Sequence, residues 1–497
     1  MLTGNSERWK VQKEVSRVGV VTAAMFVALF AAVSSIQVLQ VDELNASPLN
    51  SRTALTQLEA PRGRILVGGV PIAESVPSED PYRHQRVYTA GPVYAPVTGY
   101  LSILPSATGV ERAYGSELTG EGESQWVRRL ERVFSGGDVM TNDVELTLDS
   151  TVQQAAYDAL TDRGLTGSVV AMEPSTGRIL AMVSTPSYDP GALAGHDPDA
   201  VSATYADLEA DPAEPLVNRA LGGSLNPPGS VFKLVTASAA LESGEYDPES
   251  LFANPARIGL PGSESVVRNA TGLACGPGDE VTLARAIAQS CNVPFVQLGP
   301  ALGESTLRAM AEAYGFDRNI EIPLDVTPSS MRDGMSEAQV ALSAFGQDDV
   351  RATPLQIAMV SAAIANRGVL MTPRLVDAVI DPVNGRSSPT EPSIFSRPIS
   401  PSTSAALTEM MLTGVTSGAA MNAAIRGVDV AGKTGTAENG PDDPFSLWFT
   451  GFAPAHAPRI AITVLIEDGG GRGQAGSGSE IAAPIAREVL EAAGISS

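Results

Sequence analysis

Two lysines stand where the ability to lose a proton would matter. The chain has 33 basic residues, and only four of them are lysines, at positions 10, 13, 233 and 433. A bias toward arginine explains why lysines are few, but it does not explain where the last two fall. Arginine keeps its proton in proteins, whereas a desolvated lysine can release it. The pattern therefore raises the question of whether Lys233 and Lys433 are amines that titrate.

Ser230 and Lys233 form the first candidate site. The Pro-Pro-Gly segment at 227–229 ends regular structure, and apolar residues then follow at helical spacing, which places Ser230 at the start of a helix with Lys233 one turn on. A serine becomes a nucleophile when a base takes its proton, and an amine in a dry pocket beside another cation can be that base. The helix N-terminus would supply N–H groups to an oxyanion. A helix cap followed by a surface lysine explains the Ser-x-x-Lys pattern equally well.

A second short segment, Ser290-Cys-Asn292, begins 60 residues after Ser230 and follows a predicted helix at 282–289. Its hydroxyl could relay a proton, and the Asn292 amide could orient an acyl group. A turn that ends the helix is the ordinary structural explanation.

A third segment, Lys433-Thr-Gly-Thr436, lies 203 residues after Ser230 and just before a predicted terminal β-hairpin. We expect it on a strand that borders a cleft, where Gly435 permits close approach of a substrate backbone. Thr434 and Thr436 offer hydroxyls, and Lys433 offers a charge for a carboxylate. An exposed β-turn is the ordinary explanation. The three segments in this order favour one site for acyl transfer, because two of them contain the two lysines beyond residue 13.

The elements that must position these residues read as an α+β domain that starts near residue 143. Strands are predicted at both of its ends and helices between them, so we expect one sheet that unites the two ends. Asp149 is expected to cap the first helix. The predicted strands are 144–148, 168–172, 179–184, 446–452 and 460–467, and the predicted flanking helices are 151–163 and 480–493.

The N-terminal quarter contains an expected membrane anchor and an irregular segment. Residues 18–41 are a run of 24 residues without a charge, long enough to cross a bilayer. Four basic residues precede the run against two acidic ones, which places the N-terminus in the cytoplasm. A cleaved signal peptide is the alternative. Residues 42–142 are expected to form a pedestal, with β-like runs at 64–67 and 86–88, a helix at 123–133 and a hinge at 135–138.

Composition excludes several classes of function. The net charge of −23 argues against nucleic-acid binding. The three histidines and two cysteines have no metal-ligand spacing. Because the expected anchor places them outside the cytoplasm, we predict that Cys275 and Cys291 form a disulfide, with free buried thiols as the alternative.

The three segments, in this order, are the signature of penicillin-binding proteins and β-lactamases. The chain resembles a class B penicillin-binding protein, and most closely the actinobacterial penicillin-binding protein A type, over nearly its whole length. The similarity extends to segments 173–184, 218–220, 352–356 and 432–438 and to Arg62-Gly-Arg-Ile-Leu66. It departs at Val67-Gly-Gly69, which puts the pedestal packing in doubt, and at Asn226, where an aromatic residue is frequent.

The resemblance implies an α+β transpeptidase domain, with an antiparallel sheet and a helical subdomain, at 143–497. A cytoplasmic tail (1–17), a membrane helix (18–41) and a mixed, β-rich pedestal (42–142) would precede it. It implies a peptidoglycan D,D-transpeptidase that forms an acyl-enzyme on Ser230, is acylated by β-lactams and uses no cofactor. The expected partners are stem peptides, the membrane and a membrane glycosyltransferase.

The implied roles are specific. Ser230 attacks, Lys233 takes its proton, and Ser290 passes a proton to the leaving group while Lys433 tunes that relay. Asn292 would hold the acyl amide, and the oxyanion hole would be the N–H groups at 230 and 436. Residues 433, 434 and 436 would bind the terminal carboxylate. The rival functions are a D,D-carboxypeptidase or β-lactamase, a β-lactam sensor, and a scaffold for a glycosyltransferase.

Overall fold

The computed structural model of the chain describes residues 4–36, 60–104, 107–121, 141–383 and 385–496. The helix predicted at 123–133, the hinge at 135–138 and the last residues of the predicted membrane span lie outside these ranges.

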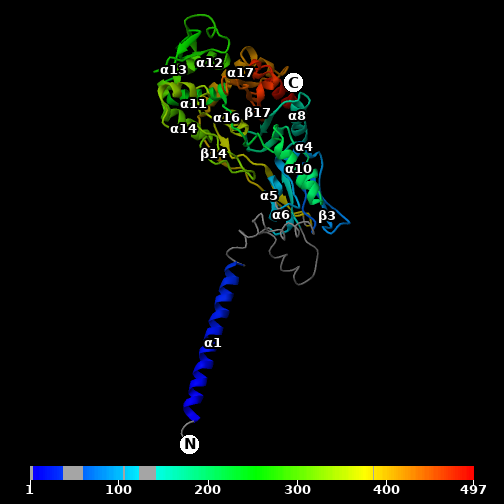
Figure 1. Ribbon diagram of the computed structural model, residues 1–497. Helices are drawn as coiled ribbons and strands as arrows, with labels where there is room; N and C mark the ends of the chain where they lie inside the picture. The colour runs from blue at the N-terminus through cyan, green and yellow to red at the C-terminus, as the bar shows by residue number, and fades with distance from the viewer. Residues whose placement is uncertain (1–3, 37–59, 105–106, 122–140, 384, 497) are drawn as a thin grey trace.

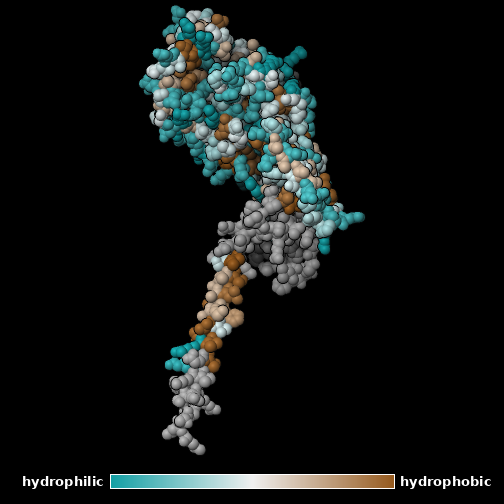
Figure 2. All heavy atoms as spheres, in the orientation of Figure 1, coloured by the Kyte–Doolittle hydropathy of each residue, from teal (hydrophilic) through white to brown (hydrophobic). Residues whose placement is uncertain are grey.

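Helix α1 (Gly4–Ser34) contains residues 18–34 of the expected membrane segment. By length and composition its Val15–Ser34 part could cross a membrane, and none of that part is buried against the rest of the described structure. Figure 1 shows α1 as a single long helix, and Figure 2 shows apolar side chains along the part of it that leads to the folded body.

One five-stranded antiparallel sheet unites the two ends of the α+β segment that starts near residue 143 (the catalytic segment), as predicted. Its order is β15-β16-β17-β5-β6, and β17 from the C-terminal end pairs with β5 from the start, with Thr463 opposite Val170. Every residue of β5, β16 and β17 is buried, because helices cover both faces of the sheet. The strands are β5 (Gly167–Met172), β6 (Ile179–Thr185), β15 (Ala431–Ala437), β16 (Ser446–Ala453) and β17 (Ile460–Ile466).

The helices on the two faces have different roles. Helices α8 (Ser150–Thr161) and α18 (Ala482–Ala492) pack on one face. As predicted, Asp149 caps α8, accepting hydrogen bonds from the N–H groups of Thr151 and Val152. Helix α16 (Pro354–Ala365) packs on the other face and is buried at every position, so it lies between the sheet and the helical lobe.

The helical lobe carries two of the three candidate segments. It consists of α11 (Lys233–Ser243), α12 (Leu283–Ala288), α13 (Val293–Leu302), α14 (Glu304–Tyr314), α15 (Glu337–Ser343) and α17 (Pro401–Ser417). Two small antiparallel pairs lie between α11 and α12 in the chain. They are β7 (Leu251–Ala253) with β10 (Glu280–Thr282), and β8 (Arg257–Gly259) with β9 (Val266–Arg268).

The pedestal sheet has six strands, in the order β13-β12-β4-β1-β2-β3. The β-like runs predicted at 64–67 and 86–88 are strands β1 and β3. The sequence did not indicate that β12 and β13, more than 200 residues further along the chain, complete the sheet through β4. The strands are β1 (Ile65–Val67), β2 (Val70–Pro77), β3 (His84–Tyr88), β4 (Asp143–Leu146), β12 (Val376–Ile380) and β13 (Ser387–Pro389).

The departure at Val67-Gly-Gly69 has a structural reason. Val67 pairs with Val70, so Gly68 and Gly69 are the two residues of a tight hairpin turn. Their φ angles are 57° and 77°, and such a turn needs positive φ at both positions, which glycine adopts without strain. The departure from the family pattern at Val67-Gly-Gly69 therefore forms a close turn that connects β1 to β2 within the pedestal sheet.

Shorter elements complete the described structure. They are α4 (Gly91–Thr98), α5 (Gly109–Ala113), α6 (Gly115–Thr119), α9 (Pro190–Leu193), α10 (Pro198–Ala210), the pair β11 (Leu370–Met371) and β14 (Ile394–Ser396), and the 3₁₀ turns η3 (Gly229–Phe232), η4 (Met421–Ala423), η5 (Asp468–Gly471) and η6 (Gly473–Ala475).

Candidate active site

Ser230 lies in a 3₁₀ turn that runs directly into α11. The turn is η3, and α11 begins at Lys233, so serine and lysine are one turn apart as predicted. Gly229 has φ 53° and donates its N–H to the Gly346 carbonyl at 2.9 Å. A Cβ at Gly229 would lie 3.0 Å from the Cβ of Ala437 on β15. Glycine is therefore needed at 229 both for the backbone angle and for the contact with β15.

Lys233 is fully buried and bonded only to neutral oxygens. Its Nζ donates to the Ser290 carbonyl at 2.8 Å and to the Asn292 Oδ1 at 2.7 Å. The ring of Phe295 lies 5.3 Å from the same nitrogen. Burial, and then the neighbouring Lys433, lower the pKa of Lys233 well below its usual value. A neutral amine has two N–H donors and one lone pair, so with both donors used the lone pair is left to accept a proton.

Ser290 joins the two lysines. Its carbonyl accepts from Lys233, and its hydroxyl accepts from the Lys433 Nζ at 2.5 Å. The φ angle of Ser290 is 61°, in the left-handed region that is uncommon outside glycine. Residues held in that region occur preferentially at functional sites. Because the hydroxyl accepts from Lys433, its own proton is free to be donated elsewhere.

Asn292 lies between Lys233 and the small β8–β9 pair. Its Oδ1 accepts from Lys233, and its Nδ2 donates to the Arg268 carbonyl at 2.8 Å. Its backbone N–H donates to the Asn269 Oδ1, also at 2.8 Å. One amide hydrogen and one lone pair of the side chain remain available. No pattern in the sequence pointed to Asn269, whose Oδ1 accepts from the N–H groups of Asn292 and Val293 at the start of α13.

Lys433 lies on β15, an edge strand of the five-stranded sheet. It is 2% exposed, and its Nζ also donates to the Thr434 carbonyl at 2.8 Å. Burial lowers the pKa of Lys433 to about 7. An amine with that pKa is present in both protonation states at neutral pH. An edge strand leaves a row of backbone groups for an added peptide.

Thr434, Gly435 and Thr436 follow on the same strand. The Thr436 hydroxyl accepts from the Gly478 N–H at 3.2 Å, and Thr434 is 6% exposed. A Cβ at Gly435 would lie 3.0 Å from the Pro228 carbonyl. Glycine at position 435 therefore lets β15 approach the turn that holds Ser230. The sequence alone indicated a different reason for glycine here, which was the close approach of a substrate backbone.

Trp448 links the five-stranded sheet to the segment that leads into the Ser230 turn. The side chain is completely buried on β16, and its Nε1 donates to the Pro227 carbonyl at 3.0 Å. Together with the packing at Gly435, this contact places the Lys433 segment beside Ser230. The structure thus brings all three candidate segments to one place. Among the described residues, none forms a hydrogen bond with the Ser230 hydroxyl, and such bonds commonly tighten only when substrate binds.

The two cysteines form a disulfide in the structure, with their Cα atoms 5.9 Å apart. Cys291 lies between Ser290 and Asn292, so the bond ties this segment to the loop that follows β9. The N–H of Cys275 donates to the Asn254 Oδ1 at 2.6 Å, which holds the other end of the bond.

Asn226, the second departure from the resemblance, points to the end of the sheet. Its amide donates to the Glu467 Oε1 at 3.0 Å and accepts from the Ser446 hydroxyl at 2.7 Å. Arg219 bonds the other oxygen of Glu467 at 2.9 Å. The Asn226 side chain is thus held by Ser446 of β16 and by Glu467, the residue that follows β17.

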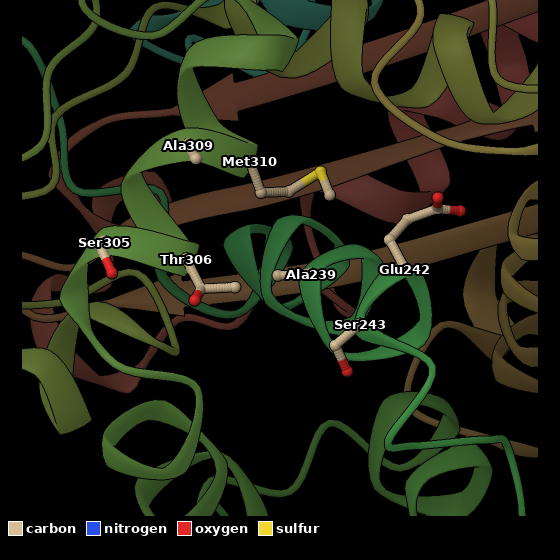
Figure 3. Close-up of a pocket in the computed structure, with 7 residues that line it drawn as sticks. All are labelled: Ala239, Glu242, Ser243, Ser305, Thr306, Ala309 and Met310. Atoms are coloured by element: carbon tan, nitrogen blue, oxygen red, sulfur yellow. The ribbon is translucent and has the colours of Figure 1, made fainter.

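A hollow of about 460 Å³ lies elsewhere, between the C-terminal end of α11 and the first turns of α14. Figure 3 shows Ala239 and Glu242 on one side and Thr306 and Met310 on the other. None of the candidate residues lines it. Within the described ranges there is also no group of three or more His, Cys, Asp or Glu side chains that could hold a metal ion.

Comparison with known proteins agrees with this geometry. Residues 167–491 match the penicillin binding protein transpeptidase domain, and residues 62–144 match the penicillin binding protein A dimerisation domain. The chain therefore belongs to the penicillin-binding protein transpeptidase family, and its mixed fold, with an antiparallel sheet, helices and an N-terminal pedestal, is that of the family.

Individual relatives and solved structures show which members of the family the chain is similar to. The chain is 43% identical to the peptidoglycan D,D-transpeptidase PbpA of Mycolicibacterium smegmatis over 96% of its own length and 98% of the relative's. Identity to the PbpA of Mycobacterium tuberculosis is 42%, with the same coverage. The ceftriaxone acyl-enzyme complex of M. tuberculosis penicillin-binding protein A superimposes with a TM-score of 0.85 at 41% identity, covering 88% of this chain and 99% of that one. The penicillin G acyl-enzyme complex gives a TM-score of 0.82 at 40% identity, covering 87% and 99%.

Proposed function

We propose that the protein is a peptidoglycan D,D-transpeptidase anchored in the cytoplasmic membrane, and that β-lactams acylate its nucleophile, Ser230. The observation that carries the proposal is the surroundings of Lys233. A buried amine whose two donors are used by neutral oxygens keeps a lone pair one helical turn from a serine hydroxyl. That arrangement is suited to a general base.

Acylation follows from these contacts. The Ser230 hydroxyl attacks the carbonyl of the D-Ala-D-Ala amide in a donor stem peptide, and its proton passes to Lys233. The C–N bond breaks, and Ser290 gives its proton to the leaving D-Ala amine while Lys433 supports that transfer electrostatically. An acceptor amine from a neighbouring strand then attacks the ester. The ester C–O bond breaks as the new amide forms, the acceptor amine gives one proton to the Ser230 oxygen, and the proton held by Lys233 returns to Ser290.

The remaining candidate residues bind and orient the donor. The N–H groups of Ser230 and Thr436 would stabilise the oxyanion. Lys433 and the hydroxyls of Thr434 and Thr436 would bind the terminal carboxylate, and the free donor and acceptor of Asn292 would hold the acyl amide. These steps use no metal or organic cofactor.

Labelling with a fluorescent penicillin tests the nucleophile. The full chain should give a labelled band on a denaturing gel, and Ser230→Ala should give none. Ser238→Ala, on the same helix, is the matched control, because it removes a buried hydroxyl that bonds to Tyr314 at 2.8 Å rather than facing the site. An equally labelled Ser230→Ala variant would contradict the assignment.

A second assay separates transfer from hydrolysis. Purified protein should release D-Ala from a donor peptide and join the remainder to an added amine. Rapid turnover of a chromogenic β-lactam would indicate a hydrolase instead. A Ser230→Ala strain with normal growth and cross-linking would indicate a scaffold.

We further propose that α1 spans the membrane once with the N-terminus inside. Under this proposal residues 1–17 form the tail, 18–41 the anchor, 42–142 the pedestal and 143–497 the extracytoplasmic transpeptidase domain. A membrane glycosyltransferase is the proposed partner, since the anchor would hold both proteins in one bilayer. Protease treatment of intact spheroplasts should digest the catalytic segment if this orientation is correct.

A further inference from the structure

Two arginines face solvent side by side on the β8–β9 pair. Arg257 and Arg268 are direct cross-strand partners, so their side chains project from the same face of the hairpin. The alternate pair, Ile258 and Val267, packs against the core on the other face. Both arginines are exposed.

This pairing is unfavourable for the fold by itself. Like charges directly opposite each other in an antiparallel pair are destabilising. Among the ion pairs between described residues, none includes Arg257 or Arg268, although the hairpin carries a carboxylate, Glu264, in its own connection. The chain as a whole has a net charge of −23. Two adjacent cations without an acidic partner on such a protein point to an anion that is not part of the chain.

The hairpin is joined to the active site by direct bonds. The carbonyl of Arg268 accepts from the Asn292 Nδ2 at 2.8 Å, and Asn292 in turn accepts from Lys233 at 2.7 Å. The next residue, Asn269, accepts from the backbone N–H of Asn292. The backbone of Arg268 therefore lies directly against Asn292, the residue that would hold the acyl part of the donor, and Arg257 is the partner of Arg268 on the neighbouring strand.

We propose that Arg257 and Arg268 bind a carboxylate of the donor stem peptide, on the residues that precede D-Ala-D-Ala. The inference rests on the proposed function, since it names a feature of the donor for that same site. Guanidinium groups bind carboxylates through paired, charge-assisted hydrogen bonds, and two such groups on one face suit one or two carboxylates on an extended peptide. The terminal carboxylate of the donor is bound separately, on β15.

The test compares two synthetic pentapeptide donors. Both end in D-Ala-D-Ala with a free terminal carboxylate. One has free carboxylates on the preceding residues, and the other has carboxamides there. The kcat/KM for D-Ala release is measured with the full chain and with the double variant Arg257→Gln, Arg268→Gln. Arg397→Gln, at an exposed arginine after β14, is the matched control.

We expect the double variant to lose about tenfold in kcat/KM on the carboxylate donor and less than about twofold on the carboxamide donor. Penicillin acylation of the variant should stay within about twofold of the wild type, and the control should match the wild type throughout. Because the arginines are exposed, added salt should reduce the preference of the wild type for the carboxylate donor.

Equal losses on both donors, or no loss on either, would overturn the inference while leaving the transpeptidase function in place. Release of D-Ala from neither donor by the wild type would instead overturn the proposed function, and the inference with it.

Discussion

The pedestal and the candidate active site each bury two basic side chains, but the buried residues have different kinds of partner. In the pedestal, Arg62 and Arg86 are almost completely buried and share one buried carboxylate, Glu111, each through a bond of 2.6 Å from its Nε. In the active site, Lys233 and Lys433 are buried just as deeply. Among the described residues, no carboxylate forms an ion pair with either lysine, and their partners are neutral oxygens.

The difference shows what each residue type contributes. Arginine cannot give up its proton, so buried arginines need a counter-charge. Burial alone would raise the pKa of Glu111, but the guanidinium groups of Arg86 and Arg62 outweigh it and lower that pKa. A lysine without a counter-charge responds to burial by losing its proton instead. Under the proposed function, the two lysines beyond residue 13 are therefore the two buried basic residues whose chemistry requires a proton that can be lost.

The largest effect is expected from placing an arginine in the active site. Lys233→Arg replaces the titratable amine with a guanidinium that stays charged, so penicillin acylation should fall by about 10³-fold, the range of a lost general base. Stopped-flow or gel-based labelling rates would measure it, with Ser238→Ala as the control. A variant that acylates at a near-normal rate would show that no neutral amine is needed at this position.

Removing the counter-charge in the pedestal should reduce stability rather than chemistry. Glu111→Gln leaves two buried guanidinium groups without a carboxylate, and we expect a loss of about 3–5 kcal/mol in the free energy of unfolding. The folded-state pKa of Glu111 lies below its unfolded value, so its stabilisation is present at neutral pH and is lost as the pH falls through the folded pKa. Urea unfolding at pH 7 and at pH 4 should therefore show a smaller difference between variant and wild type at pH 4. The same loss at both pH values would argue against the ionic role.

The pH dependence of acylation distinguishes the two lysines. Burial and the neighbouring Lys433 lower the pKa of Lys233 well below its usual value, and loss of a proton at this amine favours its role as the base. Lys433 has a pKa of about 7, so above that pH it loses the charge that attracts the carboxylate of a penicillin. The second-order acylation rate should therefore fall by about tenfold for each pH unit above the pKa of Lys433. In Lys433→Arg this falling limb should vanish, whatever the absolute rate, and a limb that stays in place would assign it to another group.

The smallest effect concerns the contact that holds the serine turn. Trp448→Phe removes the hydrogen bond to the Pro227 carbonyl, which should cost about 1 kcal/mol of stability and slow acylation several-fold. Tyr314→Phe is a matched control that removes a buried hydrogen bond from the middle of α11. It should cost similar stability and leave acylation unchanged. Equal effects of both variants on acylation would mean that Trp448 acts only through global stability.

Much of the active site could be predicted because its chemistry is local in the sequence. Ser230 and Lys233 are one helical turn apart, and Lys433 precedes a recognisable hairpin. Each segment alone also fitted an ordinary structural explanation, and the order of the three segments, as in the resembled family, singled them out. The long-range sheet was also predictable, since β-branched runs at both ends of the catalytic segment had to be covered on both faces.

Other features could not be predicted, because they depend on distant packing. Asn269 carries no pattern of its own and matters only because its side chain meets the start of α13. The partners of β4 are set by β1 on one side and by β12 on the other, and three to five residues of strand do not specify a partner more than 200 residues away.

The central place of β4 in the six-stranded pedestal sheet has a practical consequence. A recombinant catalytic fragment that begins at residue 143 would keep β4 but lose the strand beside it, leaving a bare hydrogen-bonding edge next to buried valine and leucine side chains. Such an edge promotes self-association between molecules. The shared sheet also means that residue 143 does not fall between two independent domains, because β4 pairs with β1 on one side and with β12 on the other.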